Sequence, residues 1–291
     1  MKNPKKSLSI VGIVLAVILV VGVWMYFSPR VIADARVSGW YFGHQKWSGE
    51  ILVTGDVMIF GDLAVAPGTI VKFVVGDDRG GGDEVPADGF NDADPTRLLA
   101  YSTTHSSLTI LRKLIAVGTK EQKIVFTSAS AKPTLADWEA IVFFGNGSVV
   151  DNTLVEYNRN GLNPIGRQAD SVIRNTTVQH VLWGAISTAH SGISAIGNYL
   201  ADAGHEGLDV GYEGTGQVIR GNTIENCHTA IVVLGGSAII ENNVIKNCGD
   251  GIFVEEGASP TLKNNSITLA LPDNPLSWRY GDYVIPLFEK P

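Results

Sequence analysis

The stretch Gly221-Asn222-Thr223-Ile224-Glu225-Asn226-Cys227 returns almost unchanged as Asn242-Asn243-Val244-Ile245-Lys246-Asn247-Cys248. Related segments lie on both sides of this pair. The position of Asn222 within the repeat is occupied, in chain order, by Asn152, Thr176, Asn198, Asn222, Asn243 and Asn265. The spacing is about 22 residues, and a fixed period of this length is typical of repeats that bury their apolar faces by stacking. The sequence therefore predicts a solenoid at least over residues 149–268.

Each repeat has the pattern of short β-strands. Apolar Ile224 and Ile245 alternate with charged Glu225 and Lys246, which is the period of two expected of a half-buried strand. About 22 residues suffice for three short strands and three bends, coiling once and pairing in parallel with the next coil. We therefore predict an all-β, single-stranded parallel β-helix. Asparagine tolerates bends, and its amide can bond to the same amide one coil away, so the six-residue ladder is interpreted as structural.

The repeats resemble those of the pectin-lyase-like superfamily of right-handed parallel β-helix proteins, and more closely its uncharacterised surface proteins. The similarity is carried by the rungs GNTIENC (221–227) and NNVIKNCGDGIFVEEGA (242–258), and upstream by GDVMIFGDLAVAPGTIVKF and KLIAVGTKEQKIVFTSAS. It covers about residues 50–270. The resemblance implies a right-handed coil. It does not imply one activity, because the superfamily contains lyases, hydrolases, epimerases, tailspikes and adhesins.

The N-terminus carries the second strong signal. Residues 7–27 contain no charged side chain, and their number fits the ~20 residues needed to cross a bilayer. Lys2, Lys5 and Lys6 precede them, which favours a cytoplasmic basic tip at 1–6 and an extracytoplasmic body. The segment is therefore interpreted as a transmembrane signal-anchor helix. The alternative is a cleaved signal peptide with cleavage near Ala35 and secretion of the rest.

The remaining chain is divided as follows. Residues 28–49 are expected to form a linker and N-terminal cap, and residues 50–270 the β-helix with an acidic loop inserted at 76–98. From 271 to 291 the repeat stops in an aromatic, proline-rich stretch. We interpret this tail as a C-terminal cap, because a solenoid must close its last coil.

The loop at 76–98 holds seven acidic residues and two arginines, a net of minus five out of the chain's minus seven. Asp88, Asn91, Asp92 and Asp94 offer closely spaced oxygen ligands of the kind that Ca²⁺ binds, so calcium is the one cofactor we consider; none is required. Their order is not that of an EF-hand. A solvated loop rich in glycine and proline is the competing interpretation. Since no basic stripe exists, nucleic acid is not expected as a partner.

Two groups of residues suggest catalysis. The bend column Glu156, His180, Asp202, Asn226 and Asn247 would stack an imidazole between carboxylates, within reach for proton transfer or metal binding. His205 and Glu206 precede a strand from which Asp209 points outward. Polar ladders at bends are also common for structural reasons, because bends need hydrogen-bonding side chains. We favour the structural interpretation for His180, Asp202, His205, Glu206 and Asp209.

The resemblance supports no specific enzyme. Polygalacturonase-like hydrolases carry Asn-Thr-Asp, Asp-Asp, Gly-His-Gly and Arg-Ile-Lys motifs, whereas this chain has Gly204-His205-Glu206-Gly207 and no Asp-Asp pair within a rung. No complete catalytic set transfers. Cys227 and Cys248 share a column on adjacent coils, and either a disulfide or two buried thiols would fit that spacing.

The sequence thus favours a membrane-anchored extracytoplasmic β-helix protein, at the cell surface or in the periplasm, that binds glycans or other surface components without catalysis. Its partners would be the membrane, through residues 7–27, and a polysaccharide or surface protein. The alternatives are a carbohydrate-active enzyme, either a polysaccharide lyase or a glycoside hydrolase, and a structural spacer of the cell envelope.

Overall fold

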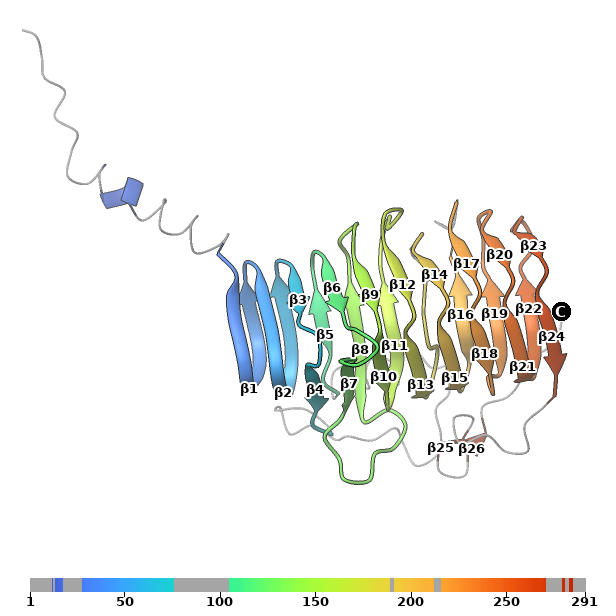
Figure 1. Cartoon of the computed structure of the whole chain (residues 1–291), viewed down its shortest axis with the longest axis horizontal. Coiled ribbons are helices and arrows are strands. Elements are labelled where there is room, and N and C mark those ends of the chain that lie inside the picture. Colours follow the sequence, from blue (N-terminus) through green and yellow to red (C-terminus); the bar gives the residue numbers. More distant parts are fainter. Residues whose placement is uncertain are drawn as a thin grey trace, which may run out of the picture.

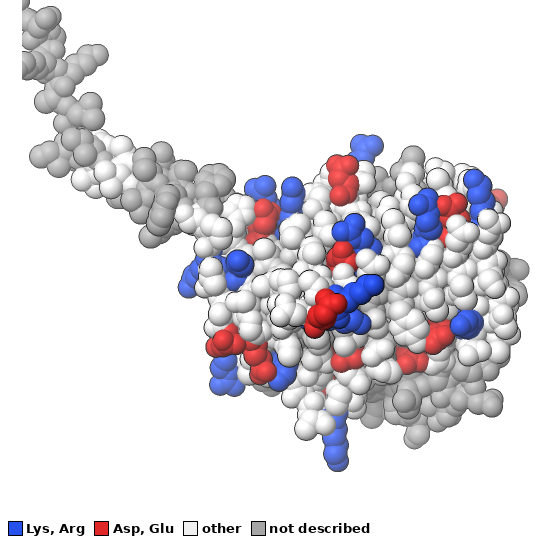
Figure 2. Space-filling view, in the orientation of Figure 1, with Lys and Arg blue, Asp and Glu red and all other residues white. Residues whose placement is uncertain are grey.

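The computed structural model describes residues 12, 14–17, 28–75, 105–188, 191–211, 216–270, 279–280 and 283–284. Its body is a stack of parallel coils, running in Figure 1 from β1 at one end to β24 at the other. The chain is therefore an all-β parallel β-helix, as the repeat predicts. On the face drawn in Figure 2, charged side chains of both signs are interspersed, with broad uncharged areas between them.

Each coil contributes one strand to each of three rows. The first two coils are formed by β1 (Arg30–Phe42) and β2 (Gln45–Phe60), which pair in parallel and each run through all three rows. The coils thus begin at Arg30, earlier than the predicted start at residue 50. The first row continues with β3 (Leu63–Val65), β6 (Leu114–Val117), β9 (Val149–Asp151), β12 (Val172–Arg174), β14 (Ser194–Ile196), β17 (Val218–Arg220), β20 (Ile239–Glu241) and β23 (Thr261–Lys263).

The second and third rows follow the same order. The second row contains β4 (Ile70–Phe73), β7 (Ile124–Ser128), β10 (Thr153–Glu156), β13 (Thr177–Val181), β15 (Tyr199–Ala203), β18 (Thr223–Glu225), β21 (Val244–Cys248) and β24 (Ser266–Leu269). The third contains β5 (Leu108–Ile110), β8 (Trp138–Phe143), β11 (Asn158–Pro164), β16 (Glu206–Val210), β19 (Thr229–Val233) and β22 (Asp250–Val254). Bridges from Ile186 to Leu162 and to Leu208 connect β11 with β16.

The core is a set of apolar columns inside the coils. Ile219, Ile240, Ile224 and Ile245 are fully buried, because the alternation of the strands turns them inward while their charged neighbours turn outward. In the N-terminal half, large aromatic side chains fill the interior, and Phe73 stacks on Trp138 with ring centroids 3.9 Å apart. Cys227 and Cys248 are free, buried thiols.

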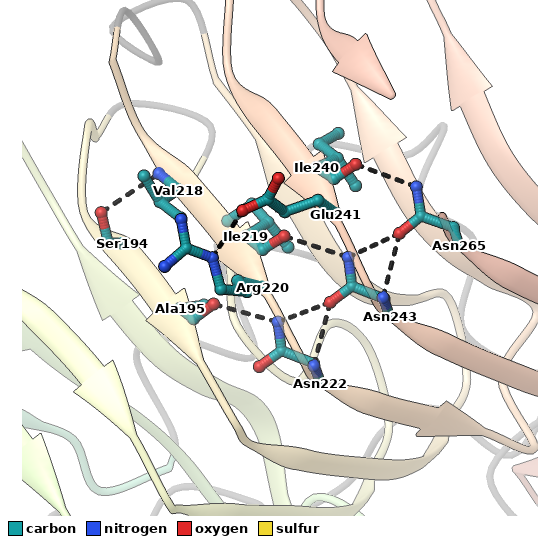
Figure 3. A network of polar contacts seen from close by, with 10 residues as sticks. All are labelled: Ser194, Ala195, Val218, Ile219, Arg220, Asn222, Ile240, Glu241, Asn243 and Asn265. Atoms are coloured by element: carbon teal, nitrogen blue, oxygen red, sulfur yellow. Dashed lines mark hydrogen bonds and ion pairs between the residues drawn. The ribbon is translucent and has the colours of Figure 1, made fainter. Parts of the chain in front are cut away.

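An asparagine ladder closes the bend between the first and second rows. The side-chain amides of Asn198, Asn222 and Asn243 donate to the amide oxygen one coil further on at 2.9–3.0 Å, and the last acceptor is Asn265. Figure 3 shows the ladder from Asn222 to Asn265. Each of these amides also donates to a backbone carbonyl, and each amide oxygen accepts a backbone N–H. The ladder thereby satisfies polar groups that would otherwise be buried without partners.

The predicted ladder is shifted at its start. Pairing of Leu154 with Thr177 places Thr153, and not Asn152, in the column beside Thr176. Asn152 instead occupies the preceding bend position in the left-handed conformation, with φ of 48°. Thr153 and Thr176 each donate a hydroxyl to a carbonyl two residues back, so threonine begins the column that asparagine continues.

Several predictions from sequence concern residues outside the described ones. Of the predicted transmembrane segment 7–27, the structure describes residues 12 and 14–17, which are helical; no helix within the described residues is long and apolar enough to cross a membrane. The calcium candidates Asp88, Asn91, Asp92 and Asp94 lie outside the described residues, as does most of the tail, where β25 (Arg279–Tyr280) and β26 (Tyr283–Val284) pair antiparallel.

Replacing Asn222 by alanine should destabilise the β-helix strongly. The change removes the acceptor of the Asn198 N–H and the donor to the Ala195 carbonyl, and unsatisfied buried groups cost about 1–3 kcal/mol each. We expect a loss of at least about 2 kcal/mol in the free energy of unfolding, measured by denaturant titration. Asn146→Ala, at an exposed amide that bonds to Asp170, should cost below about 0.5 kcal/mol. Equal losses in the two variants would contradict the role of the ladder.

Candidate functional site on the outer surface

A second polar ladder lies at the bend between the second and third rows. Its members are Tyr157, His180, Asp202, Asn226 and Asn247, one on each of five successive coils, all in the left-handed conformation with φ between 50° and 62°. His180 Nδ1 lies 3.0 Å from Asp202 Oδ2, and the Asn226 amide donates to Asp202 Oδ1. The rings of Tyr157 and His180 stack with centroids 5.3 Å apart. Tyr157 thus takes the place that the sequence assigned to Glu156.

The ion pair in this ladder shifts the pKa values of both partners. The hydrogen bond to Asp202 raises the pKa of His180, although partial burial opposes the shift. Burial alone would raise the pKa of Asp202, but hydrogen bonds from His180 and Asn226 outweigh it and lower that pKa. Both shifts favour the charged form of the side chain, and the pair links two coils.

A column of large polar side chains lies on the side of the third row that faces away from the core, although Glu139 and His228 in it are buried. Strand register places Glu139 beside Arg159, and backbone bonds continue the column coil by coil through Trp183, His205 and His228. The Trp183 and His205 rings stack with centroids 3.9 Å apart, and those of His205 and His228 with centroids 5.7 Å apart. The rings face one another along the solenoid, so their nitrogen atoms do not converge on a common point.

The first two members of this column form a largely buried ion pair. Arg159 Nη1 donates to Glu139 Oε1 at 2.7 Å, and both side chains are close to nine-tenths buried. Burial raises the pKa of Glu139, against the opposing charge of Arg159. Sequence analysis missed this pair, because the long insertions before β8 hide the repeat there. The only signal was the strand pattern of Trp138–Phe143, whose register with the later repeats could not be assigned.

The carboxylates of Glu206 and Asp209 are already bonded within the fold. The Glu206 carboxylate bonds to His205 Nδ1, and the Glu206 side chain packs over Gly184 of the preceding coil. Asp209 accepts the Ser187 hydroxyl at 2.8 Å and the Thr188 backbone N–H. Asp209 thus ties β16 to the coil before it. Both carboxylates are also largely buried, Glu206 at 4% and Asp209 at 5% exposure.

An open polar face lies on the outside of the second row. Tyr199 is 37% exposed, and its hydroxyl donates a hydrogen bond to Glu225. Desolvation, and after it this hydrogen bond, raises the pKa of the phenol to about 12. One column across, Glu156 accepts from Thr127 at 3.0 Å and from Gln179 at 2.9 Å. This face combines an aromatic ring with amide, hydroxyl and carboxylate groups. Sequence analysis did not select it, because each residue there is an ordinary outward strand position.

The structure therefore divides the catalytic candidates between two positions on the coil. His180 and Asp202 belong to the bend ladder, whereas His205, Glu206 and Asp209 belong to the third row. Within residues 28–75, 105–188, 191–211 and 216–270, no group of three or more His, Cys, Asp or Glu side chains is arranged to hold a metal ion. The fold and these contacts define a parallel β-helix repeat protein whose polar columns connect successive coils.

Comparison with known families agrees with this class. Residues 122–278, more than half of the chain, match the family described as "Periplasmic copper-binding protein (NosD)". The chain belongs to this family. Its periplasmic description agrees with the extracytoplasmic location that the N-terminal sequence predicts. Neither the curated proteins nor the solved structures gave a match.

The described residues do not fit a copper centre. Copper is bound in proteins mainly by imidazole nitrogen and by thiolate or thioether sulfur. The His205 and His228 rings stack face to face, and Cys227 and Cys248 are enclosed in the core, where burial raises the pKa of the Cys227 thiol. We therefore derive no chemistry through copper.

The His180–Asp202 pair should make stability depend on pH. A raised pKa of His180 stabilises the fold below the unfolded value of 6.5, and this contribution is lost as pH rises through the folded pKa. The lowered pKa of Asp202 stabilises the fold above 3.8 and is lost towards lower pH. Between about pH 5.5 and 8.5 the wild type should lose up to about 1 kcal/mol relative to His180→Asn, which suits the left-handed bend. Thermal unfolding of both variants across this range tests the prediction; parallel pH profiles would contradict it.

Proposed function

We propose that this chain is a membrane-anchored, extracytoplasmic β-helix protein that binds glycans or related envelope components without chemical conversion. The proposal is carried by one observation: the polar side chains that resemble a catalytic set are bonded to one another or to a neighbouring coil, while the face around Tyr199 remains exposed. It includes no role for copper, and Ca²⁺ would enter only through residues 88–94.

The face around Tyr199 has the chemistry that a hydroxyl-rich polymer requires. Sugar hydroxyls both donate and accept hydrogen bonds, so carboxylate and amide groups such as Glu225 and Gln179 suit them, and an aromatic ring offers an apolar contact. The row also repeats every ~4.8 Å along the solenoid. An extended polymer could therefore contact equivalent positions on successive coils. Charges of both signs are scattered over the face drawn in Figure 2, which supports a neutral partner over nucleic acid.

Retention of residues 1–27 is supported by the place of the alternative cleavage site. Ala33, Asp34 and Ala35 lie within β1, where Ala33 pairs with Ser48 and Ala35 with Ile51 of β2. The Asp34 carboxylate also accepts the backbone N–H of Glu50 at 2.8 Å. Cleavage near Ala35 would remove the start of a paired strand, whereas an uncleaved anchor leaves the first coil intact.

Glycan binding without cleavage can be tested on one array. The full chain, in detergent with calcium or with EDTA, should retain a polysaccharide and release no product. Tyr199→Ala should weaken retention about fivefold to tenfold through loss of the aromatic contact. The control is Tyr157→Asn, in the bend ladder, which should leave retention unchanged.

The other outcomes of this experiment favour the other functions. Product release that is sensitive to EDTA or to Asp209→Asn would identify a carbohydrate-active enzyme. Neither retention nor release would favour a structural spacer. Asp209→Asn should otherwise affect only stability, because Asp209 holds Ser187 and Thr188.

The anchor can be tested on the protein from membranes. We expect the intact mass to include residues 1–27, and the protein to stay in the membrane fraction through a high-pH carbonate wash, since a transmembrane segment resists extraction. Deleting residues 2–27 behind a cleavable export signal should release the protein. A mature N-terminus that reads Arg36-Val37-Ser38 would instead show secretion after cleavage behind Ala35.

A further inference from the structure

An apolar stripe runs along the outside of the first four coils. The third-row register sets Phe42 beside Phe60, and the backbone bonds from Leu111 N to Ile59 O and from Phe144 N to Ile110 O continue the column. Phe42 is 64%, Leu111 37% and Phe144 41% exposed, and Trp40, one column across, is 72% exposed. Such side chains in line over about 14 Å are unusual for a surface that contacts only water.

The aromatic members of this stripe pack on one another and not into the core. Phe42 and Phe60 stack with centroids 4.9 Å apart, and Trp40 meets Phe60 edge to face at 5.8 Å. These contacts hold the rings on the outer surface at the N-terminal end of the solenoid. The interior position between Trp40 and Phe42 is Tyr41, which packs against the core, so the strand alternation itself places both rings outside.

Basic side chains flank the stripe at the adjoining bend. Arg112, Lys113 and Arg167 are exposed there, and Arg112 is additionally linked to Asp62, with Nε 3.3 Å from Oδ1. Large apolar side chains bordered by Lys and Arg are characteristic of surfaces that lie in the interface of a bilayer, where the rings enter the headgroup region and the cations meet lipid phosphates.

The chain connects this end of the solenoid directly to the predicted anchor. Only residues 28 and 29 separate Phe27 from the start of β1 at Arg30, and three residues of extended chain reach about 10 Å. If residues 7–27 cross the bilayer, the first coil must lie near its surface. Trp40 and Phe42, the most exposed rings, belong to that coil.

We propose that the stripe of Phe42, Phe60, Leu111 and Phe144, with Trp40 beside it, rests on the outer surface of the bilayer, so that the solenoid lies along the membrane. The proposal rests on the anchoring proposed above and adds an orientation to it. The third-row stripe would then face the bilayer, whereas the face around Tyr199, in the second row, would remain open to a ligand.

The experiment uses the full chain in vesicles of phosphatidylethanolamine and phosphatidylglycerol. Phe42→Cys, Phe144→Cys and the control Lys72→Cys, which is in the second row, each receive a nitrobenzoxadiazole label; the unmodified protein provides the blank for its buried thiols. Iodide quenching is compared between detergent and vesicles. Labels at 42 and 144 should become at least about threefold less accessible to iodide in vesicles and shift to the blue, while the label at 72 should not change.

Each other outcome would overturn the orientation in a distinguishable way. Protection at 42 alone would place only the first coil at the interface. Protection already present in detergent, in protein whose mass in the micelle is that of a dimer, would show that a second copy covers the stripe. Full access at 42 and 144 in protein that floats with the vesicles would reject the stripe while anchoring stands. Protein that does not float would reject anchoring itself.

Discussion

Every feature of this protein depends on the parallel pairing of one coil with the next, held at the bends by side-chain amide ladders. In the asparagine ladder, each side-chain NH₂ donates to a backbone carbonyl of the preceding coil and to the amide oxygen of the next coil. Each amide oxygen also accepts a backbone N–H. A buried polar group is tolerated only when it is bonded, so the ladder fixes the register. Once the register is fixed, every position of a repeat meets the same position of its neighbours.

This stacking explains why the catalytic candidates lie beside polar or aromatic side chains of neighbouring coils. In a β-helix, a polar side chain at one position lies about 4.8 Å from the residue at the same position on the next coil. His180 therefore meets Asp202, and His205 meets Trp183 and His228. Such contacts resemble catalytic dyads in sequence, but they lie along the solenoid axis and join coils. The same stacking puts Phe42, Phe60, Leu111 and Phe144 in line. The geometry that pairs the polar candidates between coils therefore also forms the apolar stripe.

The insertions explain where sequence reasoning was incomplete. From β9 onward the coils keep a period of about 22 residues. In this part, the sequence alone reveals the ladder of Asn198, Asn222, Asn243 and Asn265. Before β9 the long segments between strands break the period. The Glu139–Arg159 pair and the displacement of Asn152 from the column both fall near this boundary, because a shift of one residue cannot be detected without a neighbouring repeat.

The sequence by itself determined the solenoid, its inner apolar columns and the asparagine ladder, because these follow from a local period that any two adjacent repeats display. The sequence also shows that residues 7–27 form an uncharged, apolar segment. Only the tertiary structure decided which outward positions become neighbours. The Glu139–Arg159 pair and the stripe from Phe42 to Phe144 unite residues where insertions break the period. The Tyr199 face lies on regular coils, but nothing in a single repeat marks its outward positions. In each case the proximity comes from backbone pairing between coils.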